Sequence, residues 1–312
     1  MVDAVVAIKE LSTEEMSLEI RQLARERQAL ILVHNYQIPP IQDLADYLGD
    51  SLDLARRSAA TSAPVIVFCG VQFMAETAKI LSPDKMVLLP RADAGCPMAD
   101  MADVEGLREL KAQHPDAKVV AYVNTNADIK AEVDVCCTSA NAVKVVQGVD
   151  ADEIIFVPDC NLASWVQRFT EKKIIPWAGF CPVHRRFKVE EIKAVRERYP
   201  DALIMVHPEC DPEVIDLIDE VASTNGMVQL VKKSDRKRFI VGTEEGLIYR
   251  LKKENPAKEF YSLGAPKVCE NMKKIRLEHV LEALQRNQYQ IEVEPEIASR
   301  AKRALDEMLK YV

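Results

Sequence analysis

Three of the eight cysteines recur in similar surroundings along the chain. Cys96, Cys181 and Cys269 each follow a short segment with a nearby glycine, and each lies eight residues before an apolar–Glu pair that opens an amphipathic helix. The pairs are Val104-Glu105, Val189-Glu190 and Leu277-Glu278. Thiolates favour zinc and iron–sulfur clusters, and three ligands leave one coordination position open where four would close the site. The spacing therefore predicts a shared metal site with an open position.

Polar residues also recur just after three apolar runs that are typical of buried parallel strands. The runs are ALILVHNY at 29–36, KVVAYVNT at 118–125 and ALIMVHPE at 202–209. Their alignment gives two equivalent sets of polar residues: His34, Asn124 and His207, followed two residues later by Tyr36, Asn126 and Glu209. Enzymes with parallel sheets bind ligands at this end of the strands. Glu209 is the ionisable acid of the second set, so we expect it to be the general base, with its pKa raised by a dry site.

A hydroxyl residue follows each of these strand ends by 15 to 17 residues. The three are Ser51, Ser139 and Thr224, and each stands where a helix is predicted to start. Serine and threonine are common N-caps, and helix N-termini attract carboxylates and phosphates. We therefore expect these residues to bind an anionic substrate.

The repeated elements also predict the fold. Each predicted helix is followed by a second apolar run that leads into another helix, and these runs are APVIVFCG, ADEIIFVPD and RKRFIVGT. Strand–helix alternation requires right-handed crossovers and parallel sheets. The fold class is thus α/β, with three pseudo-threefold-related α/β/α units, each with a small parallel sheet, around a central site. We expect domains at 1–101, 102–185 and 186–272, with the C-terminal helices of 273–312 packing back on the first.

Composition excludes several classes of protein. The chain has 312 residues, 48% hydrophobic and 29% charged, as globular proteins do. Its net charge of −8 argues against a surface for nucleic acid or anionic membranes. No apolar stretch approaches the ~20 residues that a membrane span needs, and the pattern of a secretory signal is missing. We expect a cytoplasmic protein, in which cysteines favour metal binding or catalysis over disulfides.

Nine short motifs lie between about residues 33 and 275. They are VHNYQ, GDSLDLA, FCGVQFMAETAKIL, GCPMADM, AYVNT, CTSANAV, GFCPVH, HPEC and VCENMKKI. This set closely resembles quinolinate synthases, the NadA family. The resemblance implies a [4Fe-4S] cluster with one open iron, held by Cys96, Cys181 and Cys269 at the junction of three α/β domains. It also implies condensation of iminoaspartate with dihydroxyacetone phosphate to quinolinate, phosphate and water, for NAD biosynthesis.

The resemblance extends to residues around the substrate. It implies catalytic roles for Glu209, His207, Tyr36 and Tyr122. It implies substrate binding by His34, Ser51, Met74, Asn124, Ser139, His184 and Thr224. Some relatives carry a Cys-x-x-Cys-x-x-Cys motif at the last ligand, but here Glu270, Asn271 and Met272 follow Cys269, so a disulfide switch is not expected. Because iminoaspartate is unstable, an aspartate-oxidising enzyme is a candidate transient partner.

Two other classes of protein stay open on the residues alone. Another three-cysteine [4Fe-4S] repeat enzyme, of the reductive dehydroxylase or diphthamide type, would share the scattered cysteines. A non-enzymatic iron–sulfur redox sensor would need a partner surface or a DNA-binding module, and neither is visible in the sequence. A nicotinamide enzyme is disfavoured, since no Gly-x-Gly-x-x-Gly follows a first strand. We expect the remaining cysteines to be packing residues: Cys69, Cys136, Cys137, Cys160 and Cys210.

Overall fold

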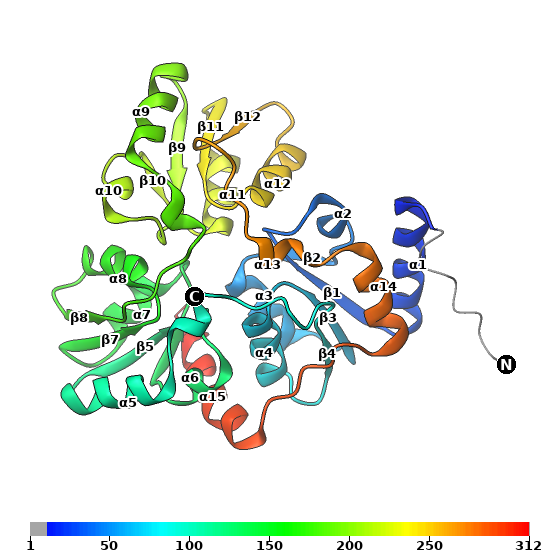
Figure 1. The fold of residues 1–312 in the computed structure, drawn as a ribbon, viewed down its shortest axis with the longest axis horizontal. Helices are drawn as coiled ribbons and strands as arrows, with labels where there is room; N and C mark the ends of the chain where they lie inside the picture. The colour runs from blue at the N-terminus through cyan, green and yellow to red at the C-terminus, as the bar shows by residue number, and fades with distance from the viewer. Residues whose placement is uncertain (1–10, 312) are drawn as a thin grey trace.

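The computed structural model describes residues 11–311 and contains three parallel sheets of four strands each (Figure 1). The strand order is β2-β1-β3-β4 in the first sheet, β6-β5-β7-β8 in the second and β10-β9-β11-β12 in the third. Each order places the first strand of the unit beside its second and third strands. The predicted fold class, three related α/β units with small parallel sheets, is confirmed.

The strands include the apolar runs that the sequence singles out. The first sheet contains β1 (Ala29–His34), β2 (Tyr47–Gly49), β3 (Val65–Cys69) and β4 (Met86–Leu88). The second contains β5 (Lys118–Tyr122), β6 (Val135–Cys137), β7 (Glu153–Val157) and β8 (Lys173–Pro176). The third contains β9 (Leu203–Val206), β10 (Glu220–Val221), β11 (Arg238–Gly242) and β12 (Glu259–Ser262). The edge strands β2, β6 and β10 have only two or three residues, too few to show a hydrophobic period in the sequence.

Helices flank each sheet in the same order. Around the first sheet lie α1 (Thr13–Glu26), α2 (Pro39–Gln42), α3 (Ser51–Ala60), α4 (Gln72–Leu81) and the 3-10 turn η2 (Ala99–Met101). Around the second lie α5 (Val104–Gln113), α6 (Ala127–Ala131), α7 (Ala142–Gly148), α8 (Cys160–Gln167) and η3 (His184–Arg186). The third unit has α9 (Val189–Arg198), α10 (Pro212–Ile215), α11 (Thr224–Lys233) and α12 (Gly246–Glu254), and the chain ends with α13 (Glu270–Lys273), α14 (Leu277–Arg286) and α15 (Pro295–Met308).

The helices that follow the three repeated cysteines begin where the sequence predicts. Helices α5, α9 and α14 each start at the apolar residue of the apolar–Glu pair and each have ten residues. The glutamate thus falls in the first turn, where a negative charge interacts favourably with the helix dipole. The eight-residue spacing therefore marks a repeated structural element, a loop that carries one cysteine and leads into a helix. The first two of these helices, α5 and α9, open the next unit, and the third is α14.

The C-terminal helices differ in part from the expected packing. Helix α14 packs against α1 and β3 of the first unit (Figure 1). Helix α15 packs mainly against α6 and β6 of the second unit, and also against α4 of the first. Its buried stripe of Ala301, Ala304, Leu305 and Met308 joins one hydrophobic core that spans both units. An amphipathic stripe identifies a buried face but not the partner that buries it.

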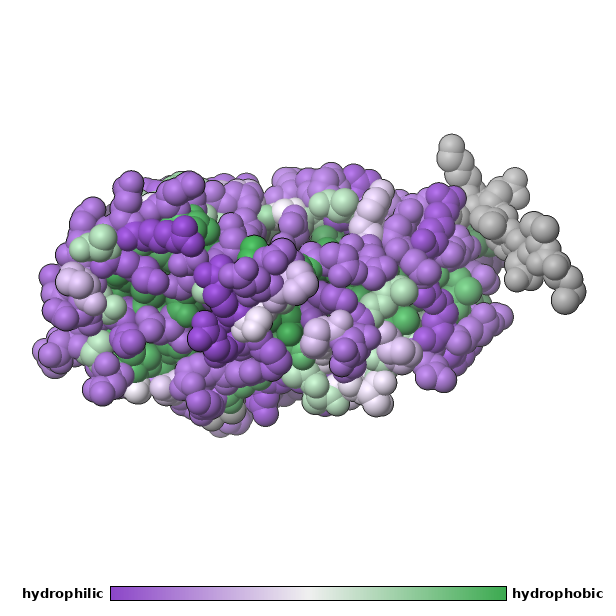
Figure 2. All heavy atoms as spheres, turned by 90° about the horizontal axis from the view of Figure 1, so that it is seen from below, coloured by the Kyte–Doolittle hydropathy of each residue, from purple (hydrophilic) through white to green (hydrophobic). Residues whose placement is uncertain are grey.

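The third unit has hydrophobic clusters of its own. One lies on the side of α9 and α10, with Ile192, Val214 and Ile240, and the other lies under α11 and α12, with Val228 and Leu251. Polar side chains predominate on the molecular face seen in Figure 2. Within residues 11–311, no helix combines the length and the apolar character that crossing a membrane requires.

Candidate active site

A single cavity lies where the ends of the three sheets meet. The space between its walls, counted with the part that is open to solvent, is about 670 Å³. All fourteen residues to which the sequence analysis assigns a role line this cavity, including both tyrosines, three histidines and three cysteines. Asn126, which the repeat aligns with Tyr36 and Glu209, does not line it, and its amide donates to Asp100 instead. They come from all three units, because the first strand of each sheet ends there. The structure therefore brings together residues that lie more than 200 positions apart in the sequence.

The three repeated thiols line the cavity from equivalent loops. Cys96, Cys181 and Cys269 follow β4, β8 and β12, and each is partly buried. Burial raises the pKa of the Cys96 thiol to about 12, and the neighbouring Cys269 adds to this shift. Burial also raises the pKa of Cys181 well above its ordinary value, with the charge of Glu209 as the next cause. A raised pKa disfavours the thiolate, so none of these thiols is a ready nucleophile by itself, and a bound metal would have to lower the pKa of each thiol that it binds.

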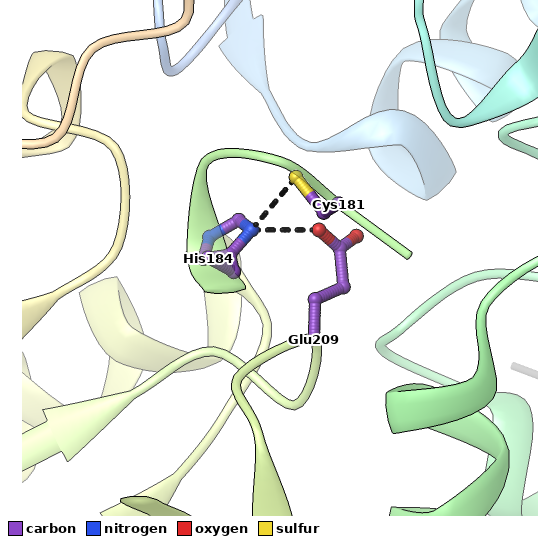
Figure 3. A group of neighbouring side chains, drawn as sticks. All are labelled: Cys181, His184 and Glu209. Carbon is purple, nitrogen blue, oxygen red and sulfur yellow. Dashed lines mark hydrogen bonds and ion pairs between the residues drawn. The ribbon is translucent and has the colours of Figure 1, made fainter. Parts of the chain in front are cut away.

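The carboxylate of Glu209 is held by two partners from the second unit. The Tyr122 hydroxyl donates to Oε1 at 2.5 Å, and Nδ1 of His184 lies 2.7 Å from Oε2. The same Nδ1 atom lies 3.2 Å from Sγ of Cys181, and Figure 3 shows both groups facing the imidazole. The donor atoms of Cys181, His184 and Glu209 lie within 4.8 Å of one another, so they could also hold a single metal ion.

The pKa of Glu209 shifts in the direction opposite to the one that the sequence analysis expects. Burial raises this pKa, but His207, His184 and the Tyr122 hydroxyl lower it by more, so the net pKa lies below the ordinary value. The prediction of a raised pKa is wrong, because it considered the burial of the carboxyl group but not the two histidines and the tyrosine that stabilise the carboxylate. Glu209 is therefore ionised at neutral pH and accepts protons or hydrogen bonds.

A second hydrogen-bonded path reaches His184 from the first unit. The Tyr36 hydroxyl lies 2.5 Å from Oγ1 of Thr243, and that oxygen lies 2.8 Å from Nε2 of His184. When Nδ1–H of His184 donates to Glu209, Nε2 is free to accept from Thr243. Polar hydrogens can thus be passed from Tyr36 to Glu209 through two side chains. Burial raises the pKa of Tyr36 and of Tyr122 well above 10, so both phenols are neutral donors.

The three hydroxyl residues line the cavity but are not N-caps, contrary to prediction. Ser51 and Thr224 are the first residues of α3 and α11, whose N-caps are Asp50 and Ser223. Ser139 precedes Asn141, the N-cap of α7, and its Oγ lies 3.2 Å from Nε2 of His207. Ser and Asp share the local signature of an N-cap, so the sequence left the choice between neighbours open. The hydroxyl of Thr224 accepts from Nδ2 of Asn35 at 2.8 Å, so its own proton is what it can offer to a ligand.

Several groups in the cavity are suited to an anionic or polar ligand. The buried Oδ1 of Asn124 has no hydrogen-bond partner within residues 11–311. Burial lowers the pKa values of His34 and His207 to about 3, so both imidazoles are neutral at pH 7. Among the residues that the structure describes, no lysine or arginine lines the cavity. Ligand charge would be met by neutral donors and by the N-termini of α3 and α11.

Comparisons with known proteins show the family of this chain. The sequence model of the NadA family, described as Quinolinate synthetase A protein, matches residues 18–310. The chain belongs to the NadA family. Among curated relatives, the quinolinate synthase of Methanoregula boonei is 55% identical over 291 residues, or 93% of this chain and 96% of the relative. The quinolinate synthase of Geobacter sp. strain M21 is 54% identical over 299 residues, or 96% of this chain and 98% of the relative.

Two residues that the sequence analysis missed complete the site of this NadA-family chain. Thr243 directly follows β11 and links Tyr36 to His184. Glu244, the next residue, is fully buried and lines the cavity. The position of Thr243 just past the second strand of its unit was a usable signal. Its equivalents after β3 and β7 are Gly70 and Pro158. Neither has a polar side chain, so the comparison of the three units did not indicate this position as functional.

Proposed function

We propose that this chain condenses iminoaspartate with dihydroxyacetone phosphate to give quinolinate, phosphate and two molecules of water, in NAD biosynthesis. Membership of the NadA family and the shared name of its relatives support the proposal. The observation that carries it is the convergence of residues from all three units on one enclosed cavity. The cavity offers thiols, neutral hydrogen-bond donors and the ionised carboxylate of Glu209 to a ligand.

Cys96, Cys181 and Cys269 would hold a [4Fe-4S] cluster with one open iron. The donor set fits, because three thiols from equivalent loops line one cavity and no side-chain amine or guanidinium of the described residues lines it beside them. When bound, such a cluster supplies a Lewis acid that polarises a carbonyl or hydroxyl oxygen. The other cysteines are placed elsewhere: Cys69, Cys136, Cys137 and Cys210 are buried in the core, and Cys160 lines a separate surface pocket.

The side chains around Glu209 would move the protons of the reaction. Condensation of an imine with a triose phosphate requires proton transfers at carbon and the departure of hydroxyl groups. Glu209 would accept a proton at a carboxylate oxygen, and the Tyr122 phenol, 2.5 Å away, would return one. Tyr36 would serve the other side of the substrate through Thr243 and His184. His207 would orient Glu209, since its Nδ1 accepts from the backbone N–H of Glu209 at 3.4 Å while its Nε2 lies 3.2 Å from Oγ of Ser139.

The two carboxylates and the phosphate of the substrates would be bound without lysine or arginine, because neither lines the cavity among the described residues. Ser51, Ser139 and Thr224 line the cavity at or near helix N-termini, and their hydroxyls would donate to these anions. His34 and Asn124 would add neutral hydrogen bonds, and Met74 would contribute an apolar wall. We further propose the domain limits 1–101, 102–185 and 186–272, because each range contains one complete sheet. A cytoplasmic location and transient contact with an aspartate-oxidising enzyme stay predictions of the sequence.

Anaerobic purification tests this function. We expect about four irons and four sulfides per chain, and quinolinate from oxaloacetate, ammonia and dihydroxyacetone phosphate. Exposure to air should bleach the cluster and remove activity together, because the open iron is reachable by oxidants. A protein that is active with zinc and without a cluster would overturn the assignment, as would a cluster whose spectrum saturating quinolinate does not change.

A further inference from the structure

A buried ion pair lies at the wall of the cavity where the first and third units meet. Nζ of Lys273, on α13, lies 2.9 Å from Oε1 and 3.1 Å from Oε2 of Glu244, which follows β11. The Glu244 side chain is fully buried and that of Lys273 is 14% exposed. Moving two charges out of water is costly, and the attraction between them offsets this cost only when further hydrogen bonds complete the geometry.

Those further hydrogen bonds reach two functional segments. Oε1 of Glu244 accepts from the backbone N–H of Cys269 at 3.1 Å, and Oε2 accepts from the N–H of Gly246 at 2.7 Å. Nζ of Lys273 donates to the backbone carbonyl of Tyr36 at 2.7 Å. One ion pair thus connects the backbone of a thiol residue with the backbone of a cavity tyrosine from another unit.

The packing around the pair leaves no free space. A Cβ at Gly246 would lie 2.8 Å from the Tyr36 carbonyl carbon, 2.9 Å from Oε2 of Glu244 and 2.9 Å from Nζ of Lys273. Nε2 of Gln42 donates to the Gly246 carbonyl at 2.8 Å and so closes the same junction from the first unit. The junction therefore fixes its members within narrow limits, which a hydrophobic contact of similar size would not do.

We propose that Glu244 and Lys273 are positioning residues that hold Cys269 and Tyr36 in register across the cavity. Glu244 fixes the N–H of Cys269, so the thiol stays directed at the cavity. Lys273 fixes the carbonyl of Tyr36, so its hydroxyl stays within reach of Thr243. The inference rests on the proposed function, because it takes Cys269 as a cluster ligand and Tyr36 as a proton donor.

A second lysine–carboxylate pair offers a matched control. Nζ of Lys253, on α12, lies 2.6 Å from Oδ1 of Asp43, so this pair also joins the third unit to the first. Its side chains are 61% and 45% exposed, and neither residue lines the cavity. Any effect of merely loosening the two units should appear equally when either pair is removed.

The experiment compares two double variants in the full chain. Glu244→Gln/Lys273→Met removes both charges of the buried pair, so no unpaired buried charge remains to prevent folding. Asp43→Asn/Lys253→Met removes the exposed pair. For each protein we would measure iron and sulfide content, the rate of cluster loss to a chelator, the melting temperature of the cluster-free chain, and kcat and KM.

We expect cluster loss to become about 10- to 100-fold faster in Glu244→Gln/Lys273→Met, as is typical when a partner of a metal ligand is removed. Its kcat should fall while KM stays near that of wild type, because Tyr36 is displaced but the anion-binding residues are not. The control double variant and both cluster-free melting temperatures should match wild type.

Two results would overturn this positioning role while the proposed function stands. One is a wild-type protein with a full cluster and a buried-pair variant that loses its cluster no faster than the control. The other is a cluster-free melting temperature that falls enough to explain the faster loss by general unfolding. A wild-type protein without iron and sulfide would instead overturn the proposed function and this role with it.

Discussion

Replacing Glu209 by Gln should stop turnover and leave the site assembled. The carboxylate accepts hydrogen bonds at both oxygens, from Tyr122 at 2.5 Å and from the His184 side at 2.7 Å. A Gln amide keeps one acceptor and places an NH₂ group at the other position. Loss of one charge-assisted hydrogen bond costs about 1.5–3 kcal/mol, or roughly 10- to 150-fold in rate. Removal of a general base costs roughly 10²- to 10⁴-fold, so we expect a decrease of about 10³-fold or more.

Single-turnover kinetics is the assay that isolates this step. Quinolinate formation would be followed after rapid mixing under anaerobic conditions, with iron content, sulfide content and substrate affinity measured on the same samples. Glu76→Gln is the matched control, since Glu76 is also buried and accepts from the N–H of Ala127 and the side chain of Gln72, both at 3.0 Å, but does not line the cavity. We expect Glu76→Gln to react within about threefold of wild type, because Glu76 does not line the cavity and so makes no contact that could change in the transition state.

One outcome would refute the role of Glu209 as a base. If Glu209→Gln bound substrate weakly but formed quinolinate in a single turnover at near wild-type rate, the carboxylate would be an anchor for substrate. A loss of the cluster in this variant would instead show that Glu209 supports Cys181. Both residues contact Nδ1 of His184, which lies 3.2 Å from Sγ of Cys181 and 2.7 Å from Oε2 of Glu209.

Three further predictions concern other parts of the site. Alanine at any one of the three cavity thiols should abolish the cluster while Cys160→Ala keeps it, which iron analysis would show; full occupancy in a thiol variant would contradict the ligand assignment. Ser139→Ala should raise KM about tenfold through the loss of roughly 1.5 kcal/mol of hydrogen bonding, with little change in kcat; an unchanged KM would remove Ser139 from the binding site. Burial raises the pKa of Asp50 to about 6 in the folded state from about 3.8, so the folded chain binds this proton more tightly and loses stability as pH rises from about 4 to 6. Asp50→Asn should therefore gain about 2 kcal/mol in free energy of unfolding relative to wild type between pH 4 and pH 7, measured by urea unfolding of the cluster-free chain; a constant difference would contradict the shift.

The sequence alone determined the repeat and most of the cavity. Strand ends, helix starts and the eight-residue interval after each thiol are local patterns, and a parallel sheet carries every strand end to the same edge. Alignment of the three units was therefore enough to select His34, Glu209 and the three repeated cysteines, with no need for distances between their atoms. The short strands β2, β6 and β10 were not predicted, because two or three residues are too few to show an alternation of apolar and polar side chains.

Only the tertiary structure decided how these residues act on one another. The direction of the Glu209 pKa depends on His184, from another unit, and on the distance between their side chains. The pairing of Glu244 with Lys273 and the packing of α15 on the second unit likewise depend on which surfaces meet. A sequence pattern records which face of an element is apolar and which end is polar. Coulombic and hydrogen-bond energies depend on separations of a few ångströms between residues far apart in the chain, and folding sets those separations.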